Sequence, residues 1–129
     1  MSTVGVVFIS HSEKIAEGLK DLVSQVVQTV PIEAAGGTDD GEIGTSLEKI
    51  QKAIKNVYSD SGVILLFDLG SSVMNAELAI ELSGLEHVKI ADAPLVEGGY
   101  VAAVEAGMGR TLDEVVKAAE EVRKKPKRI

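Results

Sequence analysis

The 129-residue sequence contains no cysteine, which excludes disulfide bonds, thiolate nucleophiles and cysteine-ligated zinc sites. Aromatic side chains make up only 3% of the chain and tryptophan is absent, so a platform for stacking bases is not expected. The 13 lysines and arginines are outnumbered by 20 aspartates and glutamates, and the net charge of −7 disfavours contact with a nucleic-acid backbone. We therefore expect no nucleic-acid partner.

Long apolar runs are also missing. None approaches the roughly 20 residues that cross a bilayer, and the first residues, MSTVGVVFISHS, lack the basic region and cleavage site of a signal peptide. We expect a cytoplasmic protein that does not contact a membrane. Hydrophobic residues nevertheless make up 45% of the chain, and its length suits one ordinary domain. We expect that domain to cover residues 1–129.

Short apolar segments rich in β-branched residues alternate with segments whose apolar residues recur every three or four positions. The expected strands are residues 4–9, 32–35, 62–67 and 87–91. The expected helices are residues 15–30, 43–57, about 73–82, 94–106 and 112–122. This alternation predicts an α/β fold with three layers, in which a four-stranded and mainly parallel sheet lies between helices.

Polar residues follow the expected strands at their carboxyl ends, where open parallel sheets bind ligands. Ser10 and His11 follow the first strand, and Asp68 follows the third. The only other histidine, His87, stands at the start of the fourth strand and belongs to the opposite edge of the sheet. Only His11 is therefore placed where a site is expected.

The residues around His11 suggest a chemistry. Ser10-His11-Ser12-Glu13 matches a capping box, which predicts Ser10 as the helix N-cap and His11 as the first helical residue. The positive end of the helix favours an uncharged imidazole, and free N–H groups there can hold a phosphate. This combination suits reversible phosphorylation on nitrogen, although His11 could equally be a polar residue without a role.

Asp68 could accept the N–H of one ring nitrogen and present the other nitrogen for attack. It could also simply cap the turn that follows it. Small residues of two loops complete the expected phosphate surroundings, together with Ser10 and Ser12. These loop residues are Gly37, Thr38, Gly70, Ser71 and Ser72.

No nucleotide, cofactor or metal site is expected. The sequence has no P-loop, no G-x-G-x-x-G after the first strand and no G-x-S-x-G motif. The adjacent pair Asp39–Asp40 could hold Mg²⁺, but solvated loop charges are the simpler interpretation.

Four segments together resemble the mannose-type IIA family of the phosphotransferase system, and within it the phosphocarrier subunits of phosphoenolpyruvate-dependent dihydroxyacetone kinases. These segments are FISHSEKIAEGL (8–19), GGTDDGEIGTSLEKI (36–50), LFDLGSSVMNAELA (66–79) and APLVEGGYVAAVEA (93–106). The resemblance covers nearly the whole chain.

The resemblance implies that His11 is the phosphorylated histidine, that its Nε2 carries the phosphoryl group, and that Asp68 orients the ring. It implies that HPr donates the phosphoryl group and that ADP bound to the DhaL subunit accepts it, with dihydroxyacetone on DhaK as the final acceptor. It also implies a homodimer. Some members carry HPr-like and enzyme I-like domains after this one; this chain ends at Ile129, so we expect a separate HPr. The chain is also not expected to add a strand that swaps between subunits.

Other functions remain open at this point. A IIA component of a mannose-type sugar transporter would use the same histidine. A receiver-like signalling domain would be phosphorylated on Asp68 with Mg²⁺ on Asp39 and Asp40, but it would carry an acidic pair where this chain has Ser10-His11. A non-catalytic dimeric binding module could use the same edge of the sheet. The dimer surface is not evident from the sequence, with helix 94–106 as one candidate.

Overall fold

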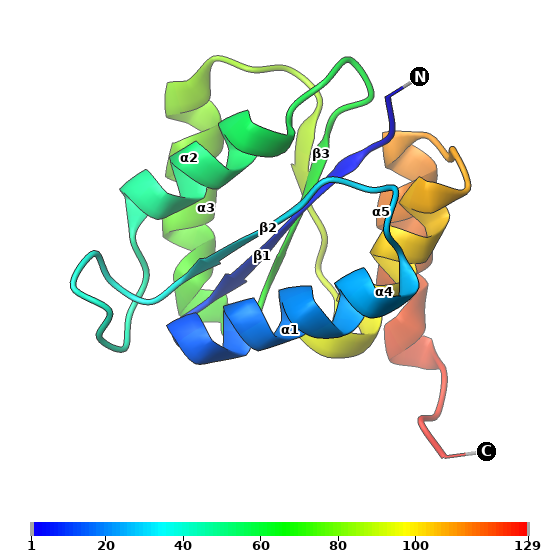
Figure 1. The fold of residues 1–129 in the computed structure, drawn as a ribbon, viewed down its shortest axis with the longest axis horizontal. Coiled ribbons are helices and arrows are strands. Elements are labelled where there is room, and N and C mark those ends of the chain that lie inside the picture. The colour runs from blue at the N-terminus through cyan, green and yellow to red at the C-terminus, as the bar shows by residue number, and fades with distance from the viewer. Residues whose placement is uncertain (1, 129) are drawn as a thin grey trace.

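A four-stranded parallel sheet lies between two layers of helices in the computed structural model, which describes residues 2–128 (Figure 1). The strands are β1 (Gly5–Ser10), β2 (Ile32–Gly36), β3 (Val63–Phe67) and β4 (Val88–Ile90). The helices are α1 (Glu13–Val26), α2 (Leu47–Val57), α3 (Val73–Ser83), α4 (Leu95–Gly107) and α5 (Leu112–Glu121), with 3₁₀ turns at Gly70–Ser72 and Val122–Lys124.

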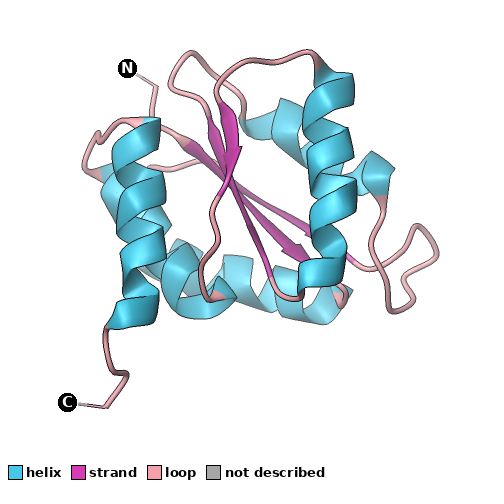
Figure 2. Cartoon of the chain, turned by 180° about the vertical axis from the view of Figure 1, so that it is seen from behind, coloured by secondary structure: helices cyan, strands magenta, loops and turns pink. Residues whose placement is uncertain are grey.

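The two faces of the sheet bury separate apolar clusters. Along β1, Val6 and Phe8 pack beneath α1, α4 and α5, whereas Val7 and Ile9 pack beneath α2 and α3. Seen from behind, β4 runs between α3 and α5 (Figure 2). Burial on both faces explains why the strands read as continuous apolar runs, and the predicted three-layer α/β fold is confirmed.

The strand order is β2-β1-β3-β4, with every pair parallel. From β1 the chain crosses to β2 on one side and later to β3 on the other, so the order reverses between β1 and β3. Crevices form at the carboxyl ends of the strands at such a reversal. The register pairs Ile9 with Phe67, which brings the next residues, Ser10 and Asp68, side by side.

Two helix boundaries differ by four residues from the prediction. The helix expected to reach residue 30 ends at Val26, because Val27 is extended and Val30 packs into the core from the loop instead. The helix expected to start at residue 43 starts at Leu47. Gly44 has a φ of 144°, which no helix contains, and the side chain of Ser46 caps the helix start.

None of the helices within residues 2–128 is both long enough and apolar enough to cross a bilayer.

Candidate functional site at the carboxyl ends of β1 and β3

The carboxylate of Asp68 gathers four hydrogen-bond donors at the reversal point of the sheet. Its Oδ2 accepts from the Ser10 hydroxyl at 2.8 Å and from the backbone N–H of His11 at 3.0 Å. Its Oδ1 lies 3.0 Å from Nδ1 of His11 and accepts from the backbone N–H of Leu69 at 2.7 Å. The segment after β1 and the segment after β3 are therefore joined through one side chain.

The protonation of this pair follows from those contacts. Partial burial raises the pKa of Asp68, but the hydrogen bonds from the side chain and backbone of His11, from Ser10 and from Leu69 outweigh it, and the pKa lies below its ordinary value. Asp68 is thus an ionised acceptor near neutral pH. Because an ionised carboxylate can only accept, Nδ1 of His11 carries the proton.

The other ring nitrogen of His11 points to the 3₁₀ turn before α3. Its Nε2 lies 2.8 Å from Oγ of Ser71, and in the neutral ring the Ser71 hydroxyl donates this bond. The His11 side chain is 21% exposed and the Asp68 side chain 18%. The ring is therefore fixed at both nitrogens, and it stays partly open to solvent.

The predicted capping box is wrong. Ser10 belongs to β1 and is fully buried, and the N-cap of α1 is Ser12, whose side chain accepts from the backbone N–H of Ile15 at 3.3 Å. The Ser10 hydroxyl instead accepts from the Ser12 N–H at 3.0 Å while it donates to Asp68. Ser10 bonds Asp68, which is distant in sequence, and this leaves Ser12 as the N-cap. His11 consequently precedes the helix.

The loop after β2 forms another wall of the site. The Gly37 amide donates to the Ser10 carbonyl at 3.1 Å, and the Gly44 amide donates to the His11 carbonyl at 2.8 Å. Asn75 of α3 donates to the hydroxyl of Thr45 at 2.8 Å. Backbone contacts and one polar bridge therefore hold this loop against both His11 and α3.

Not every predicted phosphate neighbour points toward His11. Ser72 is fully buried and donates its hydroxyl to the Leu69 carbonyl, which closes the 3₁₀ turn. The Thr38 hydroxyl accepts from the backbone N–H of Glu42 within its own loop. Gly70 lies in the turn, and apart from its chain neighbours no residue has an atom within 4 Å of the position that a Cβ would take. His87 is at the opposite edge of the sheet, where it lines a different hollow with Lys89 and Arg110.

Sequence reasoning missed the amides of Leu69 and Gly44 and the bond between Asn75 and Thr45. The amides leave no signal in side-chain chemistry, because any residue can supply a backbone N–H. The glycine-rich composition of residues 36–44 was the only hint that a loop comes close to the histidine.

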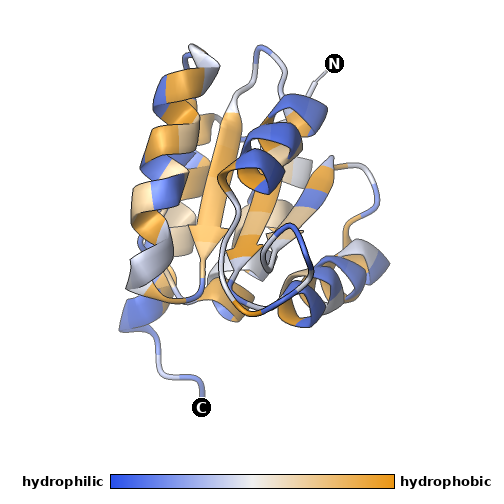
Figure 3. Ribbon diagram, turned by 90° about the vertical axis from the view of Figure 1, so that its left-hand side faces the viewer, coloured by the Kyte–Doolittle hydropathy of each residue, from blue (hydrophilic) through white to orange (hydrophobic). Residues whose placement is uncertain are grey.

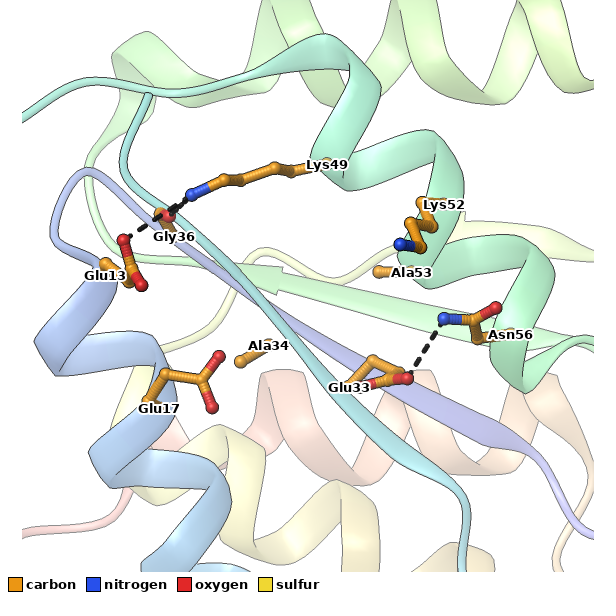
Figure 4. Close-up of a pocket in the computed structure, with 9 residues that line it drawn as sticks. All are labelled: Glu13, Glu17, Glu33, Ala34, Gly36, Lys49, Lys52, Ala53 and Asn56. Atoms are coloured by element: carbon orange, nitrogen blue, oxygen red, sulfur yellow. Dashed lines mark hydrogen bonds and ion pairs between the residues drawn. The ribbon is translucent and has the colours of Figure 1, made fainter. Parts of the chain in front are cut away.

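A charged hollow of about 330 Å³ lies beside the site, along the free edge of β2 between α1 and α2 (Figure 4). There the Lys49 ammonium donates to the Gly36 carbonyl at 2.9 Å and pairs with Glu13 at 3.6 Å, while Asn56 donates to Glu33 at 3.1 Å. Lys49 thereby occupies one backbone carbonyl of the edge strand β2, a group that another chain could otherwise pair with. His11 does not line this hollow.

Metal ligands are not clustered anywhere in residues 2–128: no group of three or more histidine, aspartate and glutamate side chains could hold an ion. Asp39, considered above for Mg²⁺, accepts a hydrogen bond from the hydroxyl of Ser46, the N-cap of α2.

Known proteins with similar sequences include two dihydroxyacetone kinase subunits. One, from Lactococcus lactis, is named the phosphotransferase subunit DhaM of a PTS-dependent dihydroxyacetone kinase; it is 38% identical over 93% of this chain and 96% of its own length. The other, from Listeria innocua, is named a phosphoryl donor subunit DhaM of a PEP-dependent dihydroxyacetone kinase; it is 41% identical over 81% of this chain and 82% of its own length.

A solved structure of a protein of unknown function, EF1359, matches 94% of this chain and 95% of its own, with a TM-score of 0.82 and 32% identity. The family model EIIA-man, described as the fructose IIA component of the phosphotransferase system, matches residues 5–116. The chain belongs to the EIIA-man family of phosphotransferase-system IIA components.

Proposed function

We propose that this chain is the phosphoryl donor subunit of a dihydroxyacetone kinase and that it carries the phosphoryl group on Nε2 of His11. The observation that carries the proposal is the fixed ring: Asp68 holds the proton on Nδ1, and Nε2 keeps its lone pair on the partly open side, against the Ser71 hydroxyl. The relatives named as DhaM support the kinase assignment.

In the first step the N–P bond of a phosphohistidine donor breaks, its electron pair returns to the donor ring, and Nε2 of His11 forms the new bond to phosphorus. The ring gains positive charge, which the ionised Asp68 offsets at 3.0 Å. The Ser71 hydroxyl must first break its hydrogen bond to Nε2 of His11, and it can then donate to a phosphoryl oxygen. Phosphoryl transfer depends mainly on such positioning and charge compensation.

In the second step an oxygen of the β-phosphate of ADP attacks phosphorus and Nε2 leaves, which regenerates His11 and forms ATP. Within the family resemblance the donor is HPr, and the ADP is held by DhaL, whose ATP then phosphorylates dihydroxyacetone on DhaK. We further propose that residues 1–129 form one IIA domain that works in the cytoplasm, where these partners would be found.

We also propose that the protein is a homodimer formed through an apolar face of α1 and α4. The face surrounds a hollow of about 370 Å³ that is lined by Leu22, Val26, Val96, Tyr100, Val101 and a single charged residue, Glu97. Leu22 and Val26 are 56% and 58% exposed. Contiguous exposed apolar surface of this kind marks an interaction site.

Two chains of charge −7 repel each other wherever their acidic residues meet. A second copy fits this face because its single charged residue, Glu97, is already paired with Lys127 at 2.8 Å. A two-fold contact would bring Tyr100 of each copy to the same patch of the other. Leu22→Glu is expected to yield monomers in sedimentation analysis. A parent protein that sediments as a monomer would contradict the dimer.

The carrier role is tested by labelling with enzyme I, HPr and ³²P-phosphoenolpyruvate. The parent and His87→Ala are expected to take up label, and His11→Ala to take up none. The label should be lost in acid and kept in base, as for a phosphohistidine. Base-labile label on a His11→Ala protein would indicate an acyl phosphate on Asp68, as in a receiver domain. Equal labelling of all three proteins would also contradict the proposal.

The acceptor is tested by adding DhaL–ADP, DhaK and dihydroxyacetone to the same mixture. Dihydroxyacetone phosphate should form only when this chain is present. Labelled His11 with no transfer to ADP would point instead to the IIB component of a mannose-type sugar transporter as acceptor.

A further inference from the structure

Ser10 is a polar residue at the end of an otherwise apolar strand. The residues before it in β1 are Gly5–Ile9, and the strands of the sheet are largely hydrophobic (Figure 3). Ser10 is nevertheless fully buried, and within residues 2–128 the other buried polar residues are Ser46 and Ser72. Burial of a hydroxyl costs free energy unless the group is hydrogen-bonded. The hydrogen bonds of these serines therefore indicate what each hydroxyl contributes.

The three buried serines differ in the groups that they bond. The Ser72 hydroxyl donates to a backbone carbonyl three residues earlier, and the Ser46 hydroxyl accepts from a backbone N–H three residues later. The Ser10 hydroxyl instead donates at 2.8 Å to Oδ2 of Asp68, which lies 58 residues away along the chain. Of the three, only Ser10 contacts the carboxylate that holds His11.

The direction of the Ser10 hydroxyl follows from its two partners. The backbone N–H of Ser12 can only donate, and it reaches Oγ of Ser10 at 3.0 Å. The ionised carboxylate of Asp68 can only accept, so the hydroxyl hydrogen points to Oδ2. The backbone of Ser10 is fixed in turn, because β1 pairs it with Gly36 of β2. Ser10 is therefore a donor with a single direction, placed by the sheet.

Ser10 acts on the oxygen of Asp68 that faces away from the ring. Oδ2 accepts from the Ser10 hydroxyl, and Oδ1 lies 3.0 Å from Nδ1 of His11. The two oxygens of a carboxylate turn together, so a donor that holds Oδ2 also keeps Oδ1 in line with Nδ1. A hydrogen bond to the ionised form also makes the carboxylate a weaker base. Both effects favour a ring that carries its proton on Nδ1.

We propose that Ser10 is a positioning residue for phosphoryl transfer, which acts through Asp68 to hold His11 in the tautomer whose Nε2 takes up the phosphoryl group. The inference rests on the proposed carrier function. The same hold serves the release step. When the N–P bond breaks, its electron pair returns to Nε2, and the ring leaves as neutral imidazole only if Nδ1 has kept its proton. The Ser10 bond disfavours loss of that proton to Asp68.

The tautomer of His11 is measured by ¹⁵N NMR of the ring in slightly alkaline solution, where an ordinary imidazole is neutral. The parent is expected to show a protonated Nδ1 and an unprotonated Nε2. In Ser10→Ala the share of the Nε2–H tautomer should rise about threefold to tenfold, because a hydrogen bond to a charged acceptor is lost. A purely structural role of Ser10 would leave the ring signals of the folded protein unchanged.

Labelling kinetics separate positioning from binding of the donor. The maximal labelling rate of Ser10→Ala should fall roughly threefold to tenfold. The fall should be the same with phospho-HPr and with phosphoramidate, a small donor whose P–N bond breaks to release ammonia. The phospho-HPr concentration at half-maximal rate should not change, because a fully buried side chain does not contact the donor.

Ser46→Ala is the matched control. Ser46 is 8% exposed, and its hydroxyl also donates to an aspartate, Asp39, while it accepts from a backbone N–H. These bonds cap α2 and do not involve His11 or Asp68. Ser46→Ala should be destabilised in urea, as Ser10→Ala should, but it should keep the parent tautomer and the parent labelling rate.

Ser10→Cys keeps the decision open to experiment if Ser10→Ala does not fold. Its sulfur fills the same space, and its weak S–H donor should give an intermediate share of the Nε2–H tautomer. The parent tautomer and the parent labelling rate in a folded Ser10 variant, or equal changes in Ser46→Ala, would overturn the proposal. Absence of His11 labelling in the parent with both donors would instead overturn the carrier function, whereas the tautomer measurement needs no donor.

Discussion

Asp68 holds His11 by two of its groups at once: one carboxylate oxygen lies 3.0 Å from Nδ1 of the ring, and the other accepts from the backbone N–H of the same residue at 3.0 Å. The ring cannot turn about its side-chain bonds without breaking the first contact, and the backbone beneath it cannot shift without breaking the second. The Nδ1 side of the imidazole and the backbone of His11 therefore both depend on one side chain, which lies directly after β3.

Asp68→Asn is expected to slow phosphoryl transfer roughly tenfold or more while the fold is kept, because positioning of the reacting nitrogen is lost. All four groups at the Asp68 carboxylate are donors, so either orientation of an asparagine amide leaves two of them facing an NH₂ group. We also expect the free energy of unfolding to fall by about 2 kcal/mol. Rapid-quench transfer from phospho-HPr and urea unfolding measure the two effects. Transfer at the parent rate would remove Asp68 from the mechanism.

Stability should depend on pH through Asp68. Because the pKa of Asp68 is lower in the folded chain than its ordinary value of 3.8, the unfolded chain binds more protons in acid. Its contribution is present above about pH 4 and is lost as the pH falls through the lower, native pKa. The difference in unfolding free energy between parent and Asp68→Asn should therefore shrink as the pH falls from 7 toward 2. A difference that is constant over this range would contradict the prediction.

Adjacent serines should have separable effects. Ser71 is exposed and contacts Nε2 of His11, so Ser71→Ala should slow transfer about threefold to tenfold and leave unfolding unchanged. Ser72 is buried and donates to the Leu69 carbonyl at 2.7 Å, so Ser72→Ala should lower the free energy of unfolding by about 1 kcal/mol. The two variants are compared by transfer kinetics and by denaturant unfolding. A Ser71→Ala protein that transfers at the parent rate would exclude contact between this hydroxyl and the phosphoryl group.

Gly36 marks the closest approach of β2 to the start of α1. A Cβ at this position would lie 2.6 Å from the Ser12 carbonyl oxygen and 2.9 Å from Cα of Glu13, so the backbone next to His11 would have to move. Gly36→Ala should destabilise the protein by about 1–3 kcal/mol and also slow transfer. Gly18→Ala is the control: Gly18 is an exposed position of α1 with open space around it, and alanine there should stabilise by about 0.5–1 kcal/mol. Equal melting temperatures of the two variants would contradict this reading of the contact.

The sequence was sufficient for the layers and for the edge of the sheet on which His11 lies, because burial on both faces and helical spacing leave direct patterns. It was not sufficient for the start of α1, since both Ser10 and Ser12 suit an N-cap and the choice is made by Asp68, which is 58 residues beyond Ser10.

The sequence also did not predict which apolar helix residues are buried and which are exposed. Ile15 and Leu22 share the helical spacing of the buried Leu19, yet they are 51% and 56% exposed. Periodicity identifies an apolar side chain on a helix, but it does not reveal how far the neighbouring α4 reaches over α1. The direction of Ser72 was hidden for a similar reason, because consecutive residues of a 3₁₀ turn point in different directions, and here Ser71 is exposed while Ser72 is buried.

The pairing of β3 with β1 also determines when, during folding, His11 meets the carboxylate that orients it. His11 is synthesised early, and the Asp68 carboxylate follows 57 residues later. The two groups become adjacent only when β3 pairs with β1. A nascent or partly unravelled chain would display the imidazole with neither tautomer enforced. The ability of His11 to accept a phosphoryl group would thus indicate that the central strands β1 and β3 have paired.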